Sequence, residues 1–164
     1  MSYNIREYKH SDKASILKIF NYYVENGTAA YPEEKVGMNY LDKFFESAEG
    51  YPFFVAENDE KKIIGFGLLH KFHPATSFLH TAEVTYFIAP EYNRQGIGNQ
   101  ILEKLIEQAK AIPVTNILAS ISSENEESLR FHQKNGFEEC GRFKKVGKKF
   151  GRYFDILWMQ KELS

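Results

Sequence analysis

The chain is 164 residues long, and 43% of its residues are hydrophobic and 15% aromatic, which suits a single globular domain with a substantial core. Its formal net charge of −1 provides no general attraction to nucleic acid or to an anionic membrane, so neither is an expected partner and any anion site must be local. One cysteine cannot form an internal disulfide, and the charged N-terminus lacks the apolar run of a signal peptide, so we expect one domain over residues 1–164 in the reducing cytoplasm.

The first half of the chain alternates between patterns typical of strands and of helices. In chain order it is predicted to contain a strand over 3–7, a helix from Ser11 to Asn26, a loop over 28–36, a helix over about 38–48, and two strands over 53–57 and 63–70. Ser11 is expected to cap the first helix, and Asn26-Gly27 to end it. The polar tetrad 58–61 lies between the two strands, which indicates an antiparallel hairpin.

The segment from Thr81 to Leu102 organises the rest of the chain. An apolar, β-branched and aromatic run from Ala82 to Ile88 predicts a buried strand, which Pro90 ends before a glycine-rich turn opens a helix. The first N–H groups of a helix have no internal partner and the helix dipole is positive there, so an anion is favoured at such a turn.

Two glycines suit this turn to an anionic ligand. Gly96 and Gly98 let the ligand approach the backbone with no Cβ in the way. The first turn of the expected helix, from Gly98 to Ile101, carries no carboxylate, and Arg94 lies just upstream. The positive end of the helix is therefore free for an anion from outside the chain.

Two common nucleotide-binding motifs fit the turn poorly. A P-loop requires a Gly-Lys-Ser/Thr ending, which is absent, and a dinucleotide fingerprint requires a third glycine where Ile101 stands. The turn resembles instead the pyrophosphate loop of the GCN5-related N-acetyltransferases (GNAT), whose pattern is Gln/Arg-x-x-Gly-x-Gly/Ala. Here it reads Asn93-Arg94-Gln95-Gly96-Ile97-Gly98, where asparagine in the first place weakens one side-chain contact but leaves the backbone groups.

The second half completes a mixed pattern. In chain order it is predicted to contain the helix from Gly98 to about Ala111, a strand over 116–122, a helix capped by Asn125 and ending at Asn135-Gly136, and strands over 137–146 and 154–163 joined by a basic loop over 147–152. The order β-α-α-β-β-β-α-β-α-β-β predicts a mixed sheet with helices on its faces, in the α/β (α+β mixed) class. This order is similar to the GNAT family over nearly the whole chain. The resemblance implies a single-domain GNAT fold, with a central, twisted mixed sheet of about seven strands flanked by about four helices.

Glu83 lies inside the expected buried strand, where a carboxylate loses hydration and must raise its pKa, find a partner or line a wet cleft. A glutamate on a solvated strand face is the plain alternative. Acetyl transfer from a thioester to an amine needs a free lone pair, so a group that accepts the ammonium proton, directly or through one water, acts as general base. The tract from Ala82 to Pro90 resembles the phosphinothricin and methionine sulfoximine acetyltransferase branch of the family, which implies this role for Glu83.

His132 is the second candidate for a catalytic role. The stretch from Asn125 to Phe137 resembles the family pattern Asn-x-x-Ala-x-x-Leu-Tyr-x-x-x-Gly-Phe, with histidine in the tyrosine place as in the phosphinothricin branch. The resemblance implies an imidazole near the coenzyme sulfur, able to hydrogen-bond the sulfur or to protonate the departing thiolate. The alternative is a helix histidine packed against Phe131 and Phe137.

The resemblance also implies two sets of ligand contacts. The coenzyme set is Tyr86, Phe87 and Ile88, whose backbone would pair with the pantetheine arm like an added strand, together with Arg94, Gln95, Gly96, Ile97, Gly98, Asn99 and Asn125. The acceptor set is Tyr31, Lys71, His80, Lys149 and Phe150, because a small amino acid needs a cation for its carboxylate and a cavity wall for its side chain. Without the resemblance, a basic loop such as 147–152 is more often a solvated turn or a weak phosphate patch.

These features predict an acetyl-CoA-dependent N-acetyltransferase that transfers acetyl directly to the amino group of a small, carboxylate-bearing amino acid or analogue, similar to phosphinothricin or methionine sulfoximine. One alternative is a different amine acceptor, such as a protein N-terminus, a polyamine or an aminoglycoside; another is a non-catalytic module that binds acetyl-CoA. No metal is expected, and the resemblance implies a homodimer. Cys140 lies outside the glycine turn, which argues against an acetyl-cysteine intermediate, and its glycine neighbour indicates a packing role.

Overall fold

The computed structural model describes residues 2–164 as one seven-stranded sheet, in the order β1-β2-β3-β4-β5-β7-β6, with four α-helices. The strands are β1 (Tyr3–Glu7), β2 (Phe53–Asn58), β3 (Ile63–Lys71), β4 (Thr81–Ile88), β5 (Asn116–Ser122), β6 (Glu138–Lys149) and β7 (Arg152–Glu162), and the helices are α1 (Lys13–Glu25), α2 (Met38–Glu46), α3 (Ile97–Ala109) and α4 (Glu126–Lys134). Neighbouring strands are antiparallel except β4 and β5, which run parallel. The predicted mixed fold is confirmed.

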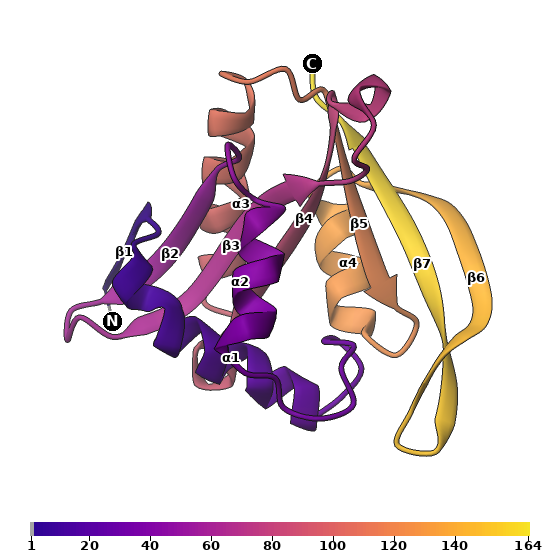
Figure 1. Ribbon diagram of the computed structural model, residues 1–164, viewed down its shortest axis with the longest axis horizontal. Coiled ribbons are helices and arrows are strands. Elements are labelled where there is room, and N and C mark those ends of the chain that lie inside the picture. The colour runs from indigo at the N-terminus through magenta and orange to yellow at the C-terminus, as the bar shows by residue number, and fades with distance from the viewer. Residues whose placement is uncertain (1) are drawn as a thin grey trace.

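The helices form two layers, one on each face of the sheet (Figure 1). On one face α1 and α2 cover a buried cluster that includes Ile16, Leu41 and Phe66. On the other face α3 packs against the sheet in a larger cluster, to which Leu129 and Phe131 of α4 are added. Each face of the sheet therefore carries a helix layer over its central strands, as the mixed strand pattern requires.

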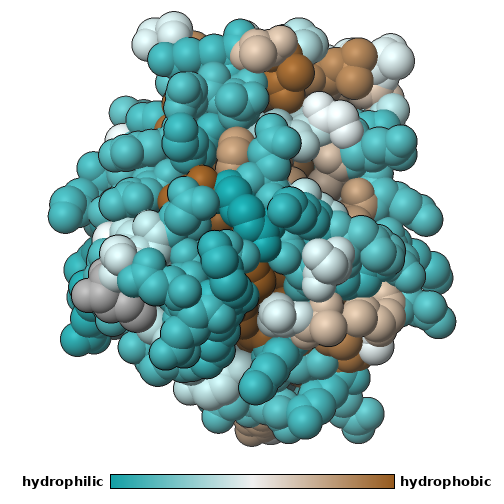
Figure 2. Space-filling view, turned by 90° about the vertical axis from the view of Figure 1, so that its left-hand side faces the viewer, coloured by the Kyte–Doolittle hydropathy of each residue, from teal (hydrophilic) through white to brown (hydrophobic). Residues whose placement is uncertain are grey.

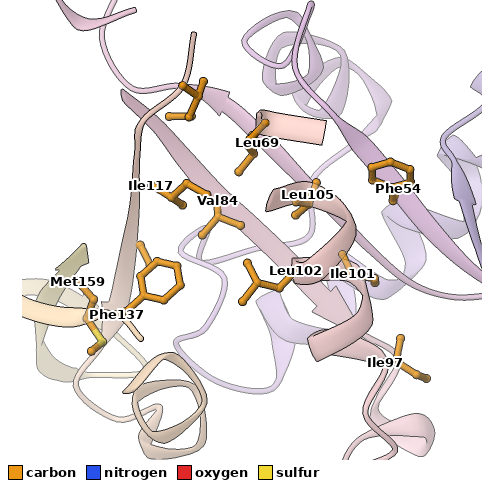
Figure 3. Packing of buried hydrophobic residues seen from close by; sticks show 14 of the residues in the cluster. Phe54, Leu69, Val84, Ile97, Ile101, Leu102, Leu105, Ile117, Phe137 and Met159 are labelled. Carbon is orange, nitrogen blue, oxygen red and sulfur yellow. The ribbon is translucent and has the colours of Figure 1, made fainter. Parts of the chain in front are cut away.

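The packing of α3 explains its position in the fold. Ile97, Ile101, Leu102 and Leu105 recur at helical spacing and are at most 1% exposed. Figure 3 shows these side chains gathered with Val84 of β4 and with residues of the neighbouring strands in one cluster. Burying a side chain of this kind contributes about 1.5–3 kcal/mol, so this face fixes the helix on the sheet.

Glycines in β3 let α3 approach the sheet closely. A Cβ on Gly67 would lie 2.4 Å from Cγ2 of Ile101, and a Cβ on Gly65 would lie 3.5 Å from Cγ2 of Ile97. Larger residues here would push the helix away from the strands. Because Gly67 pairs with Tyr86, this close approach also sets the distance between α3 and β4.

The strands β4 and β5 separate partway along their length. Their parallel pairing joins Thr81–Glu83 to Asn116–Leu118, although β4 continues to Ile88 and β5 to Ser122. Figure 1 shows the two strands diverging, with α4 at the opening between them. Within the described chain, the facing edges beyond this point have no strand partner, so the sheet contains an open wedge.

One predicted helix cap is wrong. Ser11 does not cap α1, because the chain first makes a 3-10 turn over His10–Asp12 and Asp12 becomes the N-cap residue. The Asp12 carboxylate accepts hydrogen bonds of 2.8 Å from the Arg6 guanidinium and from the Lys9 amide. By contrast, Asn125 caps α4 as predicted, with its side chain accepting from the Ser128 amide.

Two expectations about the C-terminal hairpin are also wrong. The basic segment 147–152 is no loop, because β6 and β7 continue to Lys149 and Arg152 and only Phe150-Gly151 form the turn, both with positive φ. Cys140 has no packing role, because β6 is an edge strand and its cysteine is exposed.

The surface differs between the two edges of the sheet. On the β1 side, shown in Figure 2, hydrophilic side chains cover most of the face. At the β6–β7 edge Phe143, Val146, Phe150 and Tyr153 are each more than half exposed. None of the helices in residues 2–164 combines the length and the apolar character that crossing a bilayer requires.

Candidate active site

A cleft of about 670 Å³ occupies the opening between β4 and β5. Its central walls are the β4 segment 83–88 and the β5 segment 119–122. The glycine-rich turn and α4 border one end, and α1, α2 and the segment 29–31 border the other. One connected space therefore joins the predicted anion site to Glu83.

The glycine-rich turn presents a helix N-terminus to the cleft. Gly96 is the N-cap residue of α3 with φ of 80°, a left-handed conformation that favours glycine, and a Cβ there would meet nothing within 4 Å. The first turn of α3 contains no acidic residue, as predicted, and no side chain caps the helix in the described chain. The amide N–H groups of Ile97, Gly98 and Asn99 are therefore open to an anionic ligand.

Cationic side chains gather at the same end of the cleft. Arg94, Arg130 and Lys134 all line it. Arg94 pairs with Glu127 at an N–O distance of 3.7 Å, and Arg130 pairs with Glu126 at 3.8 Å. Exposed pairs of this length are weak, so these cations remain available to a polyanionic ligand.

Glu83 lies at the point where β4 and β5 separate, and its side chain lines the cleft. Burial raises the pKa of its carboxyl to about 7. Among residues 2–164, no side chain or backbone group binds this carboxylate, and burial alone accounts for its pKa. A carboxyl with this pKa is partly ionised near neutral pH and can accept a proton from a group that enters the cleft.

His70 of β3 stands directly opposite Glu83 in the strand register. Directly opposed residues project from the same face of a sheet, so both face the α1 and α2 side. His70 is 8% exposed, burial lowers its pKa to about 4, and its Nε2 lies 3.2 Å from Oγ1 of Thr85. The neutral imidazole therefore does not compensate the charge of Glu83. His70 was not among the predicted site residues, because its place depends on the β3–β4 register and no local motif marks it.

The tautomer of His132 follows from its two hydrogen-bond partners. Nδ1 lies 2.7 Å from the Ser128 carbonyl oxygen, which can only accept, so Nδ1 carries a proton. Burial lowers the pKa of His132 to about 4, so near neutral pH Nε2 is unprotonated and accepts from the Tyr86 hydroxyl. In this arrangement His132 has no free proton for a departing thiolate. The rings of Phe131 and Phe137 lie 5.3 and 4.9 Å away, in agreement with the packing alternative.

The opposite end of the cleft is aromatic. Phe20, Tyr31, Tyr40 and Phe44 line it, and no lysine or arginine of the described residues does so at this end. The Tyr31 hydroxyl lies 2.8 Å from Oγ of Ser120, and burial raises the pKa of this phenol. This end therefore offers aromatic faces and hydroxyl groups beside the carboxyl of Glu83.

The structure brings most of the predicted site residues together. Those that line the cleft are Tyr31, Glu83, Tyr86, Phe87, Ile88, Arg94, Gly96, Ile97, Gly98, Asn99, Asn125 and His132. Five others do not line it, namely Lys71, His80, Gln95, Lys149 and Phe150.

The physical reason differs among these five residues. Lys71, His80, Gln95 and Phe150 are exposed at strand ends or in turns. Lys149 is 2% exposed and its Nζ donates to the backbone carbonyl groups of Gly27 and Ala30, so its charge does not face the cleft. Lys71 and Lys149, the two lysines of the predicted acceptor set, therefore place no positive charge at the acceptor end.

The donor groups of the cleft match a nucleotide coenzyme with an extended arm. Open amides and arginine side chains suit a diphosphate. The edge of β4 has no strand partner here and suits a chain that carries amide groups, with the Ile88 carbonyl group already accepting from the Tyr23 hydroxyl. In the part of the chain that the structure describes, no three His, Cys, Asp or Glu side chains gather as a metal site would need.

Comparisons with known proteins agree with this geometry. The family described as Acetyltransferase (GNAT) domain matches residues 5–158. The chain is 33% identical to an L-methionine sulfoximine/L-methionine sulfone acetyltransferase of Pseudomonas aeruginosa, over 100% of this chain and 96% of that protein.

Two solved structures have the same fold over nearly their whole length. A GNAT phosphinothricin acetyltransferase from Sinorhizobium meliloti in complex with AcCoA has a TM-score of 0.93 and 29% identity, covering 100% of this chain and 90% of that one. A ribosomal-protein-alanine N-acetyltransferase from Brucella melitensis has a TM-score of 0.90 and 36% identity, covering 98% and 99%. The split sheet and the open helix N-terminus thus define an acetyltransferase fold. The chain belongs to the GNAT family, as the sequence predicted.

Proposed function

We propose that the protein is an acetyl-CoA-dependent N-acetyltransferase that acetylates the amino group of a small amino acid or amino acid analogue by direct transfer. The observation that carries the proposal is that Glu83, with its raised pKa, shares one cleft with the open N-terminus of α3. The names of relatives similar over the full chain, the methionine sulfoximine and phosphinothricin acetyltransferases, support the acceptor class.

The coenzyme is held in this proposal by backbone groups more than by side chains. The amides of Ile97, Gly98 and Asn99 bind the diphosphate, and Arg94 adds positive charge. The β4 edge over 86–88 pairs with the amide groups of the pantetheine arm. Acetyl-CoA, when bound, supplies the activated acyl group as a thioester.

Glu83 prepares the acceptor for attack. An amino acid enters the cleft mainly as an ammonium ion, which has no free lone pair. The carboxylate of Glu83 accepts one proton from it, directly or through one water, and leaves a neutral amine. Because the pKa of this carboxyl is about 7, the group is ionised in a large fraction of molecules near neutral pH and returns the proton to solvent afterwards.

His132 has a positioning role in this proposal. Its Nε2 accepts the hydroxyl hydrogen of Tyr86, and its Nδ1 donates to the Ser128 carbonyl group. These two bonds fix the orientation of the Tyr86 phenol at the wall of the cleft. The roles of general base and positioning group thus fall on different residues, Glu83 and His132.

The test is a panel of acceptors assayed for thiol release from acetyl-CoA. The panel contains methionine sulfoximine, phosphinothricin, the ordinary amino acids, spermidine and an alanyl peptide. We expect kcat/KM to be at least about tenfold higher for one of the small amino acids or analogues than for spermidine, a difference of about 1.4 kcal/mol. Coenzyme binding without thiol release for any acceptor would overturn the proposal.

A protein N-terminus is the second candidate acceptor. The observation that favours it is the 36% identity to the ribosomal-protein-alanine N-acetyltransferase of Brucella melitensis. An alanyl peptide that turns over faster than every free amino acid would replace the first candidate by this one.

We further propose that the enzyme acts in the cytoplasm as a homodimer. The single cysteine, Cys140, is exposed, which suits a reducing compartment. Phe143, Val146 and Tyr153 are each more than half exposed on the β6–β7 hairpin, and a second copy of the chain can cover such apolar side chains. Light scattering that gives a monomer at micromolar concentration would overturn the dimer.

A further inference from the structure

Lys149, at the end of β6, is a buried charge with an unusual environment. Its side chain is 2% exposed, and lysine is almost never buried to this extent unless it is paired. None of the ion pairs among residues 2–164 includes Lys149, and Glu33 attracts it only from a longer distance. The cation must therefore be compensated in another way.

Backbone carbonyl groups take the place of a carboxylate. Nζ of Lys149 donates to the carbonyl oxygen of Gly27 at 2.7 Å and to that of Ala30 at 2.9 Å. Elsewhere in the described chain no further donor binds either oxygen. Both oxygens belong to the turn that follows α1, where Gly27 has φ of 149°. The ammonium group therefore holds this turn in one conformation.

The turn that Lys149 holds is also a wall of the cleft. Ala29, Ala30 and Tyr31 line the acceptor end. The carboxylate of Glu83 lies near enough to Tyr31 to contribute to the raised pKa of its phenol. Any displacement of this turn therefore changes the space beside the proposed base.

The β6–β7 hairpin also holds this turn through a second set of hydrogen bonds. Arg152, which pairs with Lys149 in the strand register, binds the Glu124 carboxylate through two hydrogen bonds of 2.8 Å. Glu124 in turn accepts a hydrogen bond of 3.2 Å from Thr28. Two neighbouring hairpin residues thus hold the segment 27–31 from outside the cleft.

We propose that Lys149 is a positioning residue that sets the acceptor wall of the active site through the carbonyl groups of Gly27 and Ala30. The inference rests on the proposed function, because the wall in question is the one assigned to the acceptor. No residue of β6 or β7 borders the cleft in the described chain. The hairpin also supports the acceptor end through the pairing of β7 with β5 and through Phe154, which stacks on Tyr31, but Lys149 acts on it through the turn alone.

The test compares Lys149→Met with Lys148→Met. Methionine keeps much of the apolar stem and donates no hydrogen bond, so the two carbonyl groups lose their donor. Lys148 is the matched control, because it lies on the same hairpin, is exposed and stacks over Tyr153. We expect the acceptor KM to rise about tenfold in Lys149→Met, with the Kd of acetyl-CoA unchanged within a factor of about two, and neither value to change in Lys148→Met.

Amide hydrogen exchange supplies a readout that needs no acceptor. We expect the segment 27–36 to exchange at least about tenfold faster in Lys149→Met than in Lys148→Met, and the segment 53–71 to exchange at an unchanged rate. Faster exchange over the whole chain, or a folded Lys149→Met variant with an unchanged segment 27–36, would overturn the proposal. Should no amino acid turn over, so that the proposed function fails, the exchange measurement still decides whether Lys149 holds this wall.

A second variant covers the case in which Lys149→Met does not fold. Lys149→Arg keeps a buried cation with N–H donors but changes their geometry. We expect the acceptor KM to rise less than in Lys149→Met, and amide exchange to be faster than in the wild type only in the segment 27–36. Exchange that increases elsewhere instead would overturn the positioning role.

Discussion

The two ends of the active-site cleft recognise charge in different ways. The coenzyme end relies on open backbone amides at the start of α3, supported by Arg94, Arg130 and Lys134. The acceptor end presents aromatic rings, hydroxyl groups and the carboxyl of Glu83, with no arginine or lysine among its described lining residues. Backbone amides do not change with the side chain, whereas the groups that characterise the acceptor end are side chains. The fold therefore binds the coenzyme, and the choice of acceptor depends on individual residues.

Replacing Glu83 with glutamine should have the largest effect on this contrast between the two ends, because it removes the only proposed base from the acceptor end. We expect turnover to fall about 100-fold or more, while the Kd of acetyl-CoA stays the same. In the wild type kcat/KM rises as the pH passes the carboxyl pKa of about 7, because only the ionised form accepts a proton. Glu83→Gln should lose this rise, and a variant with unchanged turnover would refute the role.

Thermal unfolding supplies a check on Glu83 that is independent of catalysis. The folded pKa of about 7 lies above the ordinary value of 4.5, so between these values the native state binds the proton more tightly than the unfolded chain does. Stability must therefore decrease as the pH rises through this window. Glu83→Gln should lack that decrease, whereas parallel curves for the two proteins would contradict the raised pKa.

A carboxylate placed at the coenzyme end should have the next largest effect. Asn99→Asp is nearly isosteric and still accepts the hydrogen bond of 3.0 Å from Asn135. The new charge favours the helix dipole by about 0.3–1 kcal/mol, yet it repels a diphosphate. We expect the Kd of acetyl-CoA, measured by calorimetry, to rise about tenfold or more while the melting temperature stays equal or increases.

The control for this variant is Gln108→Glu, which makes the same change of charge on the exposed far end of α3. Its coenzyme affinity should match that of the wild type. A loss of affinity in both variants would assign the effect to net charge, and a loss of stability in Asn99→Asp would point to misfolding instead of repulsion.

The smallest of these effects concerns the acceptor end. Tyr31→Phe removes the hydrogen bond to Ser120, and losing a bond worth about 1 kcal/mol should raise the acceptor KM about fivefold without altering the coenzyme Kd. Ser120→Ala removes the same bond from the other side. The double variant should therefore resemble either single one, and additive effects would show that the two hydroxyl groups act separately.

Local sequence patterns were enough to predict the strands and helices, and the family resemblance that these patterns carry implied the sheet and much of the cleft. Periodicity defines the strands and helices, and the glycine turn and the Asn125 cap each depend on a few consecutive residues. Glu83 stands out for a similar reason, because a carboxylate interrupts an apolar strand. These features need no knowledge of which strands are neighbours.

Features that depend on strand register escaped prediction. His70 enters the site only because β3 pairs with β4 so that it faces Glu83. Lys149 was predicted to bind the acceptor from a basic loop, yet the hairpin continues and its ammonium group donates to carbonyl groups more than a hundred residues earlier in the chain. Cys140 is exposed because β6 lies at the edge of the sheet, and the chain order alone does not reveal that position.

The glycines beneath α3 limit how the specificity of such an enzyme can change during evolution. The side chains of Ile101 and Leu105 rest directly on the strand backbone at Gly67, so the helix has little room to shift on the sheet and the spacing from the glycine turn to Glu83 changes little. Mutation can reshape the pocket walls over generations without altering where an acyl group arrives. New substrates would then be gained at the periphery of the fold, and a bulkier residue at Gly67 would disturb all of them at once.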